Sequence, residues 1–249
     1  MLHLFNDHFQ NFKRYNIPKA QLAIADIPYN LGTNAYASNS AWYKDGKIAN
    51  GESDKAGKAF FDTDNDFRVA EFMHFCSKML IKEPKAVGQS PCMIVFCAFE
   101  QQAPLIELAK RYGFMHYINL VFRKKSSPSV LKANMKIVGN CEYGLILYRE
   151  KLPKFNNDGK MIMNCIDWQS DGKDIPKVHP TQKPVKLLEY LIRLFTDVGD
   201  VVIDPCAGSG STLLASENLG RKAYGFEIKK DFCKLANEKM FSKVQKVLF

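Results

Sequence analysis

A glycine-rich segment near the end of the chain most constrains what this protein can fold into. Residues 204–212 read Asp-Pro-Cys-Ala-Gly-Ser-Gly-Ser-Thr, between an apolar run at 201–203 and a helical pattern at 211–219. Glycines at a strand-to-helix turn let the backbone turn tightly and approach a ligand closely. In doubly wound sheets, ligands bind outside the carboxyl ends of the strands. The segment therefore predicts an α/β fold with a ligand site at this turn.

Glu227 strengthens this interpretation. It ends the next predicted strand, 223–226, roughly 20 residues after the glycines, where an acidic residue can accept hydrogen bonds from ribose hydroxyls. Dinucleotide dehydrogenases share this arrangement, but Leu213 stands where their third glycine would be. A tight turn without a ligand is the alternative, and the acidic groups of Asp204 and Glu227 argue against it.

Strand-like and helical patterns alternate along the rest of the chain. This alternation predicts one doubly wound, largely parallel sheet, and the length of 249 residues fits a single domain. Strands are expected at 22–25, 93–99, 118–122 and 143–148, and helices at 67–81, 103–112, 185–195 and 231–241.

Composition excludes several classes of protein. Apolar residues make up 46% of the chain, which suffices for a sizeable core and argues against global disorder. The seven cysteines form no C-x-x-C pair and the five histidines lack zinc-site spacing, so neither disulfides nor a structural metal is expected. With no signal peptide and no apolar run near the roughly 18 residues of a membrane span, we expect a cytoplasmic protein. The formal charge of +9 favours a polyanionic partner such as nucleic acid, although a generic basic protein has the same charge.

A second motif, Asp26-Ile27-Pro28-Tyr29, follows the predicted strand at 22–25. Together with the glycine segment, it resembles the signature of DNA amino-methyltransferases, Asp-Pro-Pro-Tyr and Asp-Pro-x-x-Gly-x-Gly. The order of the two motifs is similar to that of the β class, whose chain is circularly permuted. Two further strings match this class: Tyr29-Asn30-Leu31-Gly32, and His179-Pro180-Thr181-Gln182-Lys183-Pro184 before a helix.

The resemblance implies a Rossmann-like methyltransferase sheet, mostly parallel with one antiparallel strand, and a small target-recognition insertion. It implies S-adenosylmethionine as the cofactor and double-stranded DNA as the partner. Asn6-Asp7 resembles an element that contacts the cofactor's adenine, and Lys183 is expected near the methionine carboxylate. The full set of expected cofactor residues is Asp7, Asp26, Thr181, Lys183, Asp204, Pro205, Ala207, Gly208, Gly210, Thr212 and Glu227.

The chemistry of the tetrapeptide fits methyl transfer to an amino group. An aromatic amine is a poor nucleophile, because its lone pair is delocalised into the ring. Two acceptors aimed at the amino hydrogens, the Asp26 carboxylate and the Ile27 carbonyl, would favour a more nucleophilic nitrogen. Tyr29 can stack on a base that has left the duplex. The catalytic residues are therefore expected to be Asp26, Ile27, Pro28 and Tyr29, with Ile27 standing where the family has proline.

Lysine and arginine in two stretches are candidates for contacts with DNA phosphates. The resemblance places target recognition within 123–178, and we expect DNA contacts from Asn30, Arg123, Lys124, Lys125 and Lys132. The polar segment 30–66 is expected to be a mobile loop that closes over DNA, or a surface excursion. A homodimer or a companion subunit would suit so short a recognition region. Further candidates are Lys151, Lys154, Lys160, Lys173 and Lys177, for each of which a solvated loop is the alternative.

Three other functions stay open at this point. The same scaffold methylates the N4 amino group of cytosine, although aspartate at the first tetrapeptide position favours adenine. Ile27 stands where the family has proline, so a second alternative is a DNA-binding protein that has lost catalytic activity. A nicotinamide-dependent oxidoreductase would share the glycine turn, but it would not explain the Asp26 tetrapeptide.

Overall fold

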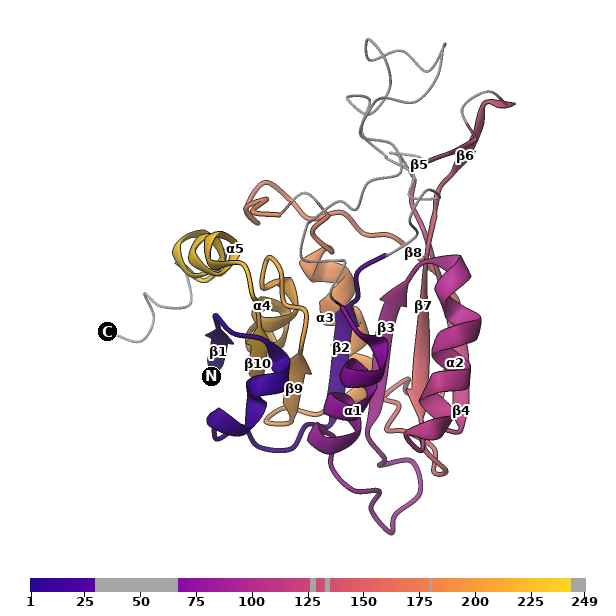
Figure 1. The fold of residues 1–249 in the computed structure, drawn as a ribbon. Helices are drawn as coiled ribbons and strands as arrows, with labels where there is room; N and C mark the ends of the chain where they lie inside the picture. Colours follow the sequence, from indigo (N-terminus) through magenta and orange to yellow (C-terminus); the bar gives the residue numbers. More distant parts are fainter. Residues whose placement is uncertain (30–66, 126–128, 133–134, 180, 243–249) are drawn as a thin grey trace.

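An eight-stranded sheet forms the centre of the protein in a computed structural model, which describes residues 1–29, 67–125, 129–132, 135–179 and 181–242 (Figure 1). The strand order is β1-β10-β9-β2-β3-β7-β4-β8. The bounds are β1 Leu2–Phe5, β2 Leu22–Asp26, β3 Cys92–Cys97, β4 His116–Arg123, β7 Cys141–Tyr148, β8 Cys165–Asp167, β9 Val201–Asp204 and β10 Lys222–Phe226.

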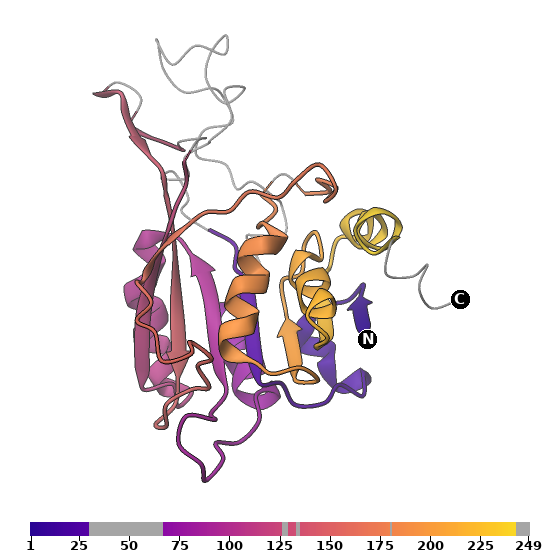
Figure 2. The same cartoon turned by 180° about the vertical axis from the view of Figure 1, so that it is seen from behind.

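Helices cover both faces of this sheet. Helices α1 (Val69–Met79) and α2 (Gln102–Arg111) lie on one face, and α3 (Val185–Phe195) and α4 (Ser211–Asn218) lie on the other (Figures 1 and 2). Alternate residues of β2 point to opposite faces and join two separate hydrophobic clusters. A 3-10 helix η1 (Phe9–Arg14), a short η6 (Phe99–Gln101), α5 (Lys230–Leu235) and a π-helical turn η8 (Ala236–Met240) complete the layers. Among the described helices, none has the length and apolar character needed to cross a membrane.

The predicted fold class is confirmed. Strand β7 pairs antiparallel with both β3 and β4, while the other neighbouring pairs in the sheet are parallel. The strands with continuous apolar runs, β2 and β3, are buried at the centre, as expected for strands covered on both faces. The circular permutation stays a prediction.

Several elements were not predicted from the sequence. Strand β1 is a short edge strand that mixes exposed and half-buried residues, and β8 has only three residues, so neither gives a clear periodic signal. A two-stranded hairpin, β5 (Ser129–Lys132) and β6 (Ile137–Gly139), projects beyond the sheet (Figure 1).

The expected recognition region at 123–178 is not one continuous insertion. Strand β7 lies within it and is an interior strand of the main sheet, because both β3 and β4 pair with it. The hairpin lies before β7 in the sequence, and the segment 149–178 after β7 includes the edge strand β8 of the same sheet. The role of the range 123–178 in target recognition stays a prediction.

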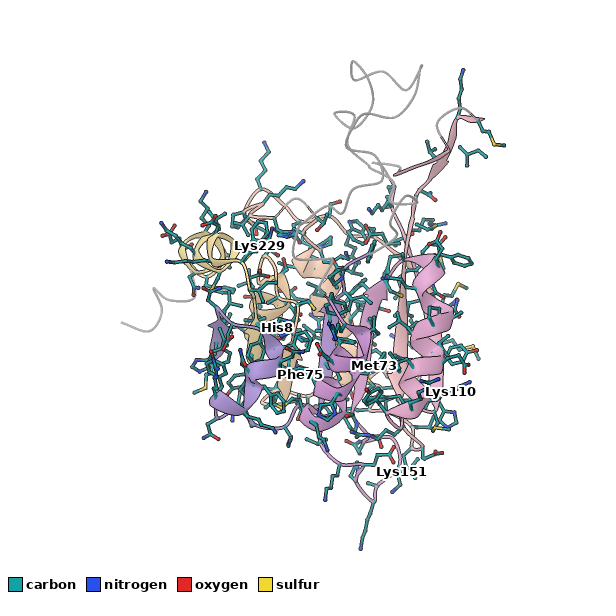
Figure 3. The ribbon with its side chains drawn as sticks, in the orientation of Figure 1. His8, Met73, Phe75, Lys110, Lys151 and Lys229 are labelled. Atoms are coloured by element: carbon teal, nitrogen blue, oxygen red, sulfur yellow. The ribbon has the colours of Figure 1, made fainter. Side chains whose placement is uncertain are left out.

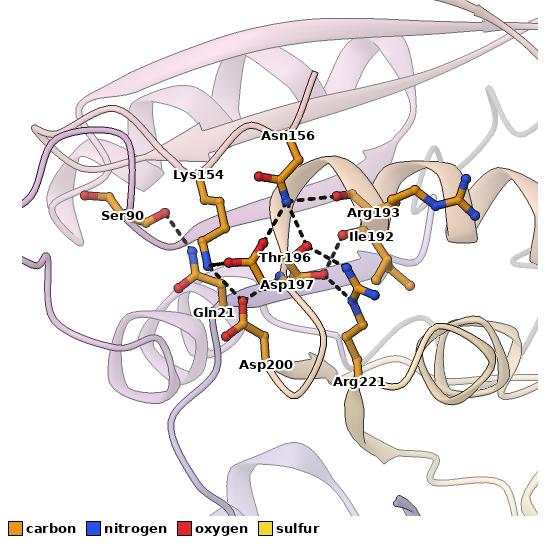
Figure 4. Close-up of polar contacts among 10 residues, drawn as sticks. All are labelled: Gln21, Ser90, Lys154, Asn156, Ile192, Arg193, Thr196, Asp197, Asp200 and Arg221. Atoms are coloured by element: carbon orange, nitrogen blue, oxygen red, sulfur yellow. Dashed lines mark hydrogen bonds and ion pairs between the residues drawn. The ribbon is translucent and has the colours of Figure 1, made fainter. Parts of the chain in front are cut away.

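A buried polar network fixes the segment after β7 against the turn between α3 and β9 (Figure 4). The Lys154 ammonium lies 2.6 Å from Asp197 Oδ2 and 3.1 Å from Asp200 Oδ2. The Arg221 guanidinium donates to the Thr196 carbonyl at 2.6 Å and to its hydroxyl at 3.0 Å. Lys154 is 7% exposed, so this candidate for a DNA contact lies neither in a solvated loop nor on the surface, and its charge is engaged by the two carboxylates.

Candidate active site at the carboxyl edge of the sheet

The two sequence motifs meet at one edge of the sheet. Strand β2, which ends at Asp26, pairs in parallel with β9, which ends at Asp204 and leads into the glycine turn. The carboxyl ends of β1, β10, β9, β2 and β3 all lie at this same edge, because these strands are parallel. The chain therefore brings the tetrapeptide beside the glycine turn, as a ligand site shared between them requires.

The glycine turn uses backbone conformations that other residues adopt with strain. Gly208 has a φ of 49° and Gly210 a φ of 77°, both in the left-handed region. A Cβ atom on Gly210 would overlap the ring of Phe241, whereas one on Gly208 would approach the His179 ring no closer than 3.8 Å. Gly210 thus allows the Phe241 ring to pack closely beneath the turn. Gly208 forms the outer part of the turn.

Glu227 holds the glycine turn from the neighbouring strand. Its Oε2 accepts a hydrogen bond from the Gly208 amide at 2.9 Å, and its Oε1 accepts one from the Lys229 amide at 2.7 Å. The side chain of Asn6 donates to the Glu227 carbonyl at 2.9 Å. Three strands, β1, β9 and β10, therefore meet around this carboxylate, which is 8% exposed.

Asp204 is a buried carboxylate at the end of β9. Its Oδ1 accepts a hydrogen bond from the Cys206 amide at 2.9 Å. Burial raises the pKa of Asp204 to about 7, and hydrogen bonds from Thr212 and the Cys206 amide offset only part of that effect. The nearby charges of Asp26 and Glu227 raise this pKa further. Asp204 thus braces the first turn of the motif from within.

Asp7 lies directly after β1 and organises its own loop. Its Oδ1 accepts from the His8 amide at 2.7 Å and the Asn11 side chain at 2.6 Å, and its Oδ2 accepts from the Tyr15 hydroxyl at 2.8 Å. These hydrogen bonds, with the Asn11 bond first, lower the pKa of Asp7. The Asp7 carboxylate therefore ties together both ends of η1, next to the edge where Asn6 contacts Glu227.

The tetrapeptide is held by backbone contacts to β3 and η6. The Ile27 amide donates to the Phe96 carbonyl at 3.2 Å, a bond that proline could not make, and the Ile27 side chain is 1% exposed in the core. Gln101 donates to the Pro28 carbonyl at 2.8 Å. Packing and hydrogen bonding thus fix the loop where the family's proline would stiffen it.

Lys183 pairs directly with Asp26. Its Nζ lies 2.5 Å from Asp26 Oδ2 and 3.2 Å from Glu142 Oε2, and the Lys183 side chain is 8% exposed. Burial lowers the pKa of this ammonium, but the two carboxylates outweigh burial and raise it overall. Burial raises the pKa of Asp26, and the attraction of Lys183 offsets part of that rise. Lys183 is therefore a charged group at the centre of the site.

The other oxygen of Asp26 is an open acceptor within the described part of the chain. Asp26 Oδ1 and the Tyr29 hydroxyl are both buried and lie close enough for each to shift the pKa of the other, but neither has a well-formed hydrogen bond to a described residue. Buried polar groups are nearly always paired in native structures. A carboxylate oxygen and a hydroxyl without well-formed hydrogen bonds, at the carboxyl edge of the sheet, indicate a place where a polar ligand can bind.

The string before α3 lies over the glycine turn. The His179 ring is close to Gly208, packs against Phe232 and accepts from the Thr181 amide at 3.3 Å. Burial, then the charges of Lys183 and Lys229, lower the pKa of His179 to about 4, so the ring is neutral at pH 7. Thr181 itself is exposed beside this ring. The string thus joins Lys183 to the glycine turn.

Glu142 was not among the predicted site residues. It is the second residue of β7, and because β7 is antiparallel, its beginning lies at the edge where the parallel strands end. Lys183 and Lys124 lower the pKa of Glu142 despite its burial. The sequence does show a charged residue at the start of an apolar strand. Placing that residue at the active site, however, also requires knowing the direction of the strand in the sheet.

The predicted DNA contacts fall into different settings. Arg123 is exposed and donates twice to Asp167 Oδ1, by Nε at 2.9 Å and by Nη2 at 2.7 Å, while Lys125 is exposed. Lys124 differs, because it forms an ion pair with Glu142 and lies 4.9 Å from the centre of the Trp168 ring. Its ammonium is engaged by these groups within the protein, and its predicted contact with DNA stays a prediction.

Other candidates lie away from the edge or outside the description. Lys151 is at the opposite end of the molecule from Lys229, which lies at the carboxyl edge (Figure 3), and its ammonium donates to the Pro84 carbonyl at 2.8 Å. Asn30 and the predicted loop at 30–66 lie outside the described residues, as does the side chain of Lys132.

All seven cysteines are free thiols. Across the described residues, no group of three or more His, Cys, Asp or Glu side chains could hold a metal ion.

Comparison with known proteins identifies relatives across most of the chain. A family model described as DNA methylase matches residues 20–238. The methylase YubD of Escherichia coli is 30% identical over 63% of this chain and 64% of that protein. The DNA adenine methyltransferase YhdJ of Escherichia coli is 25% identical over 93% of this chain and 80% of that protein.

A solved structure resembles the whole fold. The M1.HpyAVI complex with S-adenosylmethionine superposes with a TM-score of 0.66 and 20% identity, covering 96% of this chain and 98% of the other. At that identity the likeness concerns the fold, and the fold in that structure carries the cofactor predicted from this sequence.

Proposed function

This chain belongs to the family of N6/N4 DNA methylases, and on that premise we propose that it transfers a methyl group from S-adenosylmethionine to the N6 amino group of adenine in double-stranded DNA. S-adenosylmethionine is the methyl donor of this family. The observation that carries the proposal is the state of Asp26. One oxygen is fixed by Lys183, and the other is buried near the Tyr29 hydroxyl without a well-formed hydrogen bond among the described residues.

Asp26 accepts a hydrogen bond from the target amine in this proposal. A buried carboxylate oxygen without a donor carries a large desolvation cost, which an N–H group entering the site would relieve. The bond draws electron density toward the amine nitrogen, and the Ile27 carbonyl accepts the second hydrogen. The nitrogen then displaces the sulfur in line: a C–N bond forms, a C–S bond breaks, and the sulfonium becomes a neutral thioether. The raised pKa of Asp26 suits it to take the proton that the nitrogen loses.

The target base leaves the duplex to reach Asp26, because its amino group is otherwise paired and stacked. Tyr29 lies at the same strand end, and its ring centre is 5.7 Å from Lys183 Nζ. An aromatic ring in this place can stack on a flipped base, a contact that contributes about 1–3 kcal/mol in nucleic-acid sites. Pro28 fixes the backbone φ angle between these two side chains.

The glycine turn and its neighbours hold the cofactor. Backbone at Pro205, Ala207, Gly208 and Gly210 can approach it closely, and the Glu227 carboxylate can accept hydrogen bonds from ribose hydroxyls. Asp204 and Thr212 brace this turn. In this proposal Asp7 would face the adenine end of the cofactor and Thr181 and Lys183 its methionine end. Lys183 also holds Asp26. This donor set fits an adenosyl ligand.

DNA lies across the carboxyl edge in this proposal. The exposed Arg123 and Lys125 and the projecting β5–β6 hairpin lie there, and a two-stranded ribbon fits the major groove of DNA. Met135, Ile137 and Val138 of the hairpin segment are exposed, as side chains that contact bases need to be. The net charge of +9 supports attraction to phosphates. A homodimer or companion subunit stays a prediction.

Nucleoside analysis of DNA tests the proposed base. The protein is expressed in cells that lack their own DNA methyltransferases, and the DNA is hydrolysed and analysed by mass spectrometry. We expect N6-methyladenine above the level in cells that carry an empty vector. N4-methylcytosine in its place would contradict the adenine assignment but keep the chemistry of Asp26. Neither base, with the protein folded and bound to cofactor, would favour a DNA-binding role without catalysis.

A further inference from the structure

Four charged side chains alternate in sign across the active site. Asp26 contacts Lys183, Lys183 also contacts Glu142, and Glu142 forms an ion pair with Lys124. Beyond Glu142, the Lys124 ammonium lies over the ring of Trp168. The chain of contacts therefore runs from the carboxyl end of β2 to the start of β7 and on to the segment after β8.

Protein stability alone explains such an arrangement poorly. Buried ion pairs lose much of their Coulomb energy to desolvation, and apolar residues of the same volume often stabilise a protein as well or better. The side chains of Glu142 and Lys183 are 19% and 8% exposed, so both are largely removed from water. A buried carboxylate retained beside the proposed methyl acceptor site points to a role in the reaction.

We propose that Glu142 is a positioning residue for methyl transfer, which shares the Lys183 ammonium with Asp26 and so keeps Asp26 a strong, fixed acceptor for the target amine. The inference rests on the function proposed above for Asp26. With a second carboxylate on Lys183, the ammonium fixes one oxygen of Asp26 without neutralising the whole carboxylate. The other oxygen keeps its negative charge for the amino hydrogen.

Lys124 holds Glu142 from the other side. Its ammonium pairs with Oε1 of Glu142, while Lys183 approaches Oε2. Two cations on two oxygens fix the plane of the carboxylate, and the contact of Lys124 with Trp168 fixes Lys124 in turn. Glu142 is therefore held between two cations, and its Oε2 contacts Lys183 as an ion pair without a well-formed hydrogen bond among the described residues.

The charge of Glu142 also affects the protonation of Asp26. The charged or titratable groups that face Asp26 are Lys183, Glu142, Tyr29, Cys97, Asp204 and Cys206. Among these groups, Glu142 raises the pKa of Asp26 and Lys183 lowers it. Removing the charge of Glu142 therefore lowers the pKa of Asp26, and a role confined to packing would leave that pKa in place.

The test compares Glu142→Gln with wild type in the full-length protein. Methyl transfer to DNA is measured from pH 5 to 9 with saturating cofactor, and the folded state is checked by thermal unfolding. We expect kcat to fall by about 10- to 100-fold, the scale of a misplaced reacting group. We also expect the acidic limb of the kcat profile to move to lower pH. Glu107→Gln is the matched control, because Glu107 is exposed on α2, and it should behave as wild type.

Glu142→Asp separates position from charge. It keeps the charge but withdraws the carboxylate by one methylene, so kcat should fall severalfold while the acidic limb stays in place. Wild-type kcat in both variants, or a lower kcat of Glu142→Gln with an unmoved limb, would overturn the proposal. If Glu142→Gln does not fold, wild-type kcat in Glu142→Asp overturns it alone. Asp26→Asn is measured alongside: an active Asp26→Asn refutes the proposed function, whereas an inactive one with a wild-type Glu142→Gln refutes only this inference.

Discussion

The ammonium of Lys183 lies 2.5 Å from Asp26 Oδ2, although 157 positions separate the two residues in the sequence. This contact joins the tetrapeptide at the end of β2 to the string that precedes α3. Because the same string lies over the glycine turn through His179, one ion pair connects the proposed methyl acceptor site to the proposed cofactor site.

Replacing Lys183 with methionine tests how much this contact stabilises the protein. The change leaves two largely buried carboxylates, Asp26 and Glu142, without their shared cation, and breaking such a pair costs about 3–5 kcal/mol. Urea unfolding at pH 7 measures the loss. Lys186→Met, one residue into α3 and exposed, is the control and should unfold as wild type does. An unfolding free energy of Lys183→Met equal to that of wild type would show that the ion pair contributes nothing.

Replacing Gly210 with alanine tests the packing of the glycine turn. A Cβ atom there would overlap the Phe241 ring, and the φ of 77° is unfavourable for alanine. Gly113→Ala is the matched control, because Gly113 has a φ of 86° but open space around its Cβ position. The control should lose only the backbone term of about 1–2 kcal/mol. Gly210→Ala should lose more and bind S-adenosylmethionine more weakly by calorimetry; equal losses would refute the role of close packing.

Asp204 predicts a pH-dependent stability. Its pKa is about 7 in the folded protein and 3.8 as a free side chain, so the folded state holds more protons between these values. The contribution of Asp204 to the free energy of unfolding is therefore fully present below pH 4, and it is lost as the pH rises towards 7. Asp204→Asn removes the titration, so its stability relative to wild type should increase from pH 4 to pH 7 and then level off. Urea unfolding across this range measures the difference, and a constant difference would contradict the raised pKa.

The polar network around Arg221 should contribute to the stability of the fold but not to the rate of methyl transfer (Figure 4). Arg221→Met removes the donors to the Thr196 carbonyl and hydroxyl and to the Leu219 carbonyl. Since each unsatisfied buried group costs roughly 1–3 kcal/mol, we expect a loss of about 2–4 kcal/mol. The kcat measured well below the unfolding temperature should not change. Arg193→Met, with an exposed side chain, is the control; a similar loss in that variant would count against the network.

The meeting of Asp26 with the glycine turn could be predicted from the sequence. Each motif follows an apolar strand, and parallel strands place their carboxyl ends at one edge of a sheet. Glu142 could not be predicted in the same way. Its position depends on β7 running antiparallel beside β3, and an apolar strand pattern does not reveal strand direction.

The lysines show the same limit. Lys124 lies in a basic run that is typical of an exposed loop. Its ammonium nevertheless forms an ion pair with Glu142, which lies 18 positions later in the chain. Lys154 reads as a loop lysine, but Asp197 and Asp200, more than 40 positions later, hold it inside. A charge pattern in sequence does not distinguish a phosphate contact from a buried ion pair, because the partner is distant along the chain.

The most direct test of the central claim is a comparison of Asp26→Asn with wild type. S-adenosylmethionine binding is measured by calorimetry, and methyl transfer to the same genomic DNA is measured with labelled cofactor. We expect cofactor binding within a few-fold of wild type and a rate of transfer lower by about 100-fold or more, the contribution typical of a positioned proton acceptor. A rate for Asp26→Asn close to wild type would contradict the assignment of Asp26 as the acceptor of the target amine.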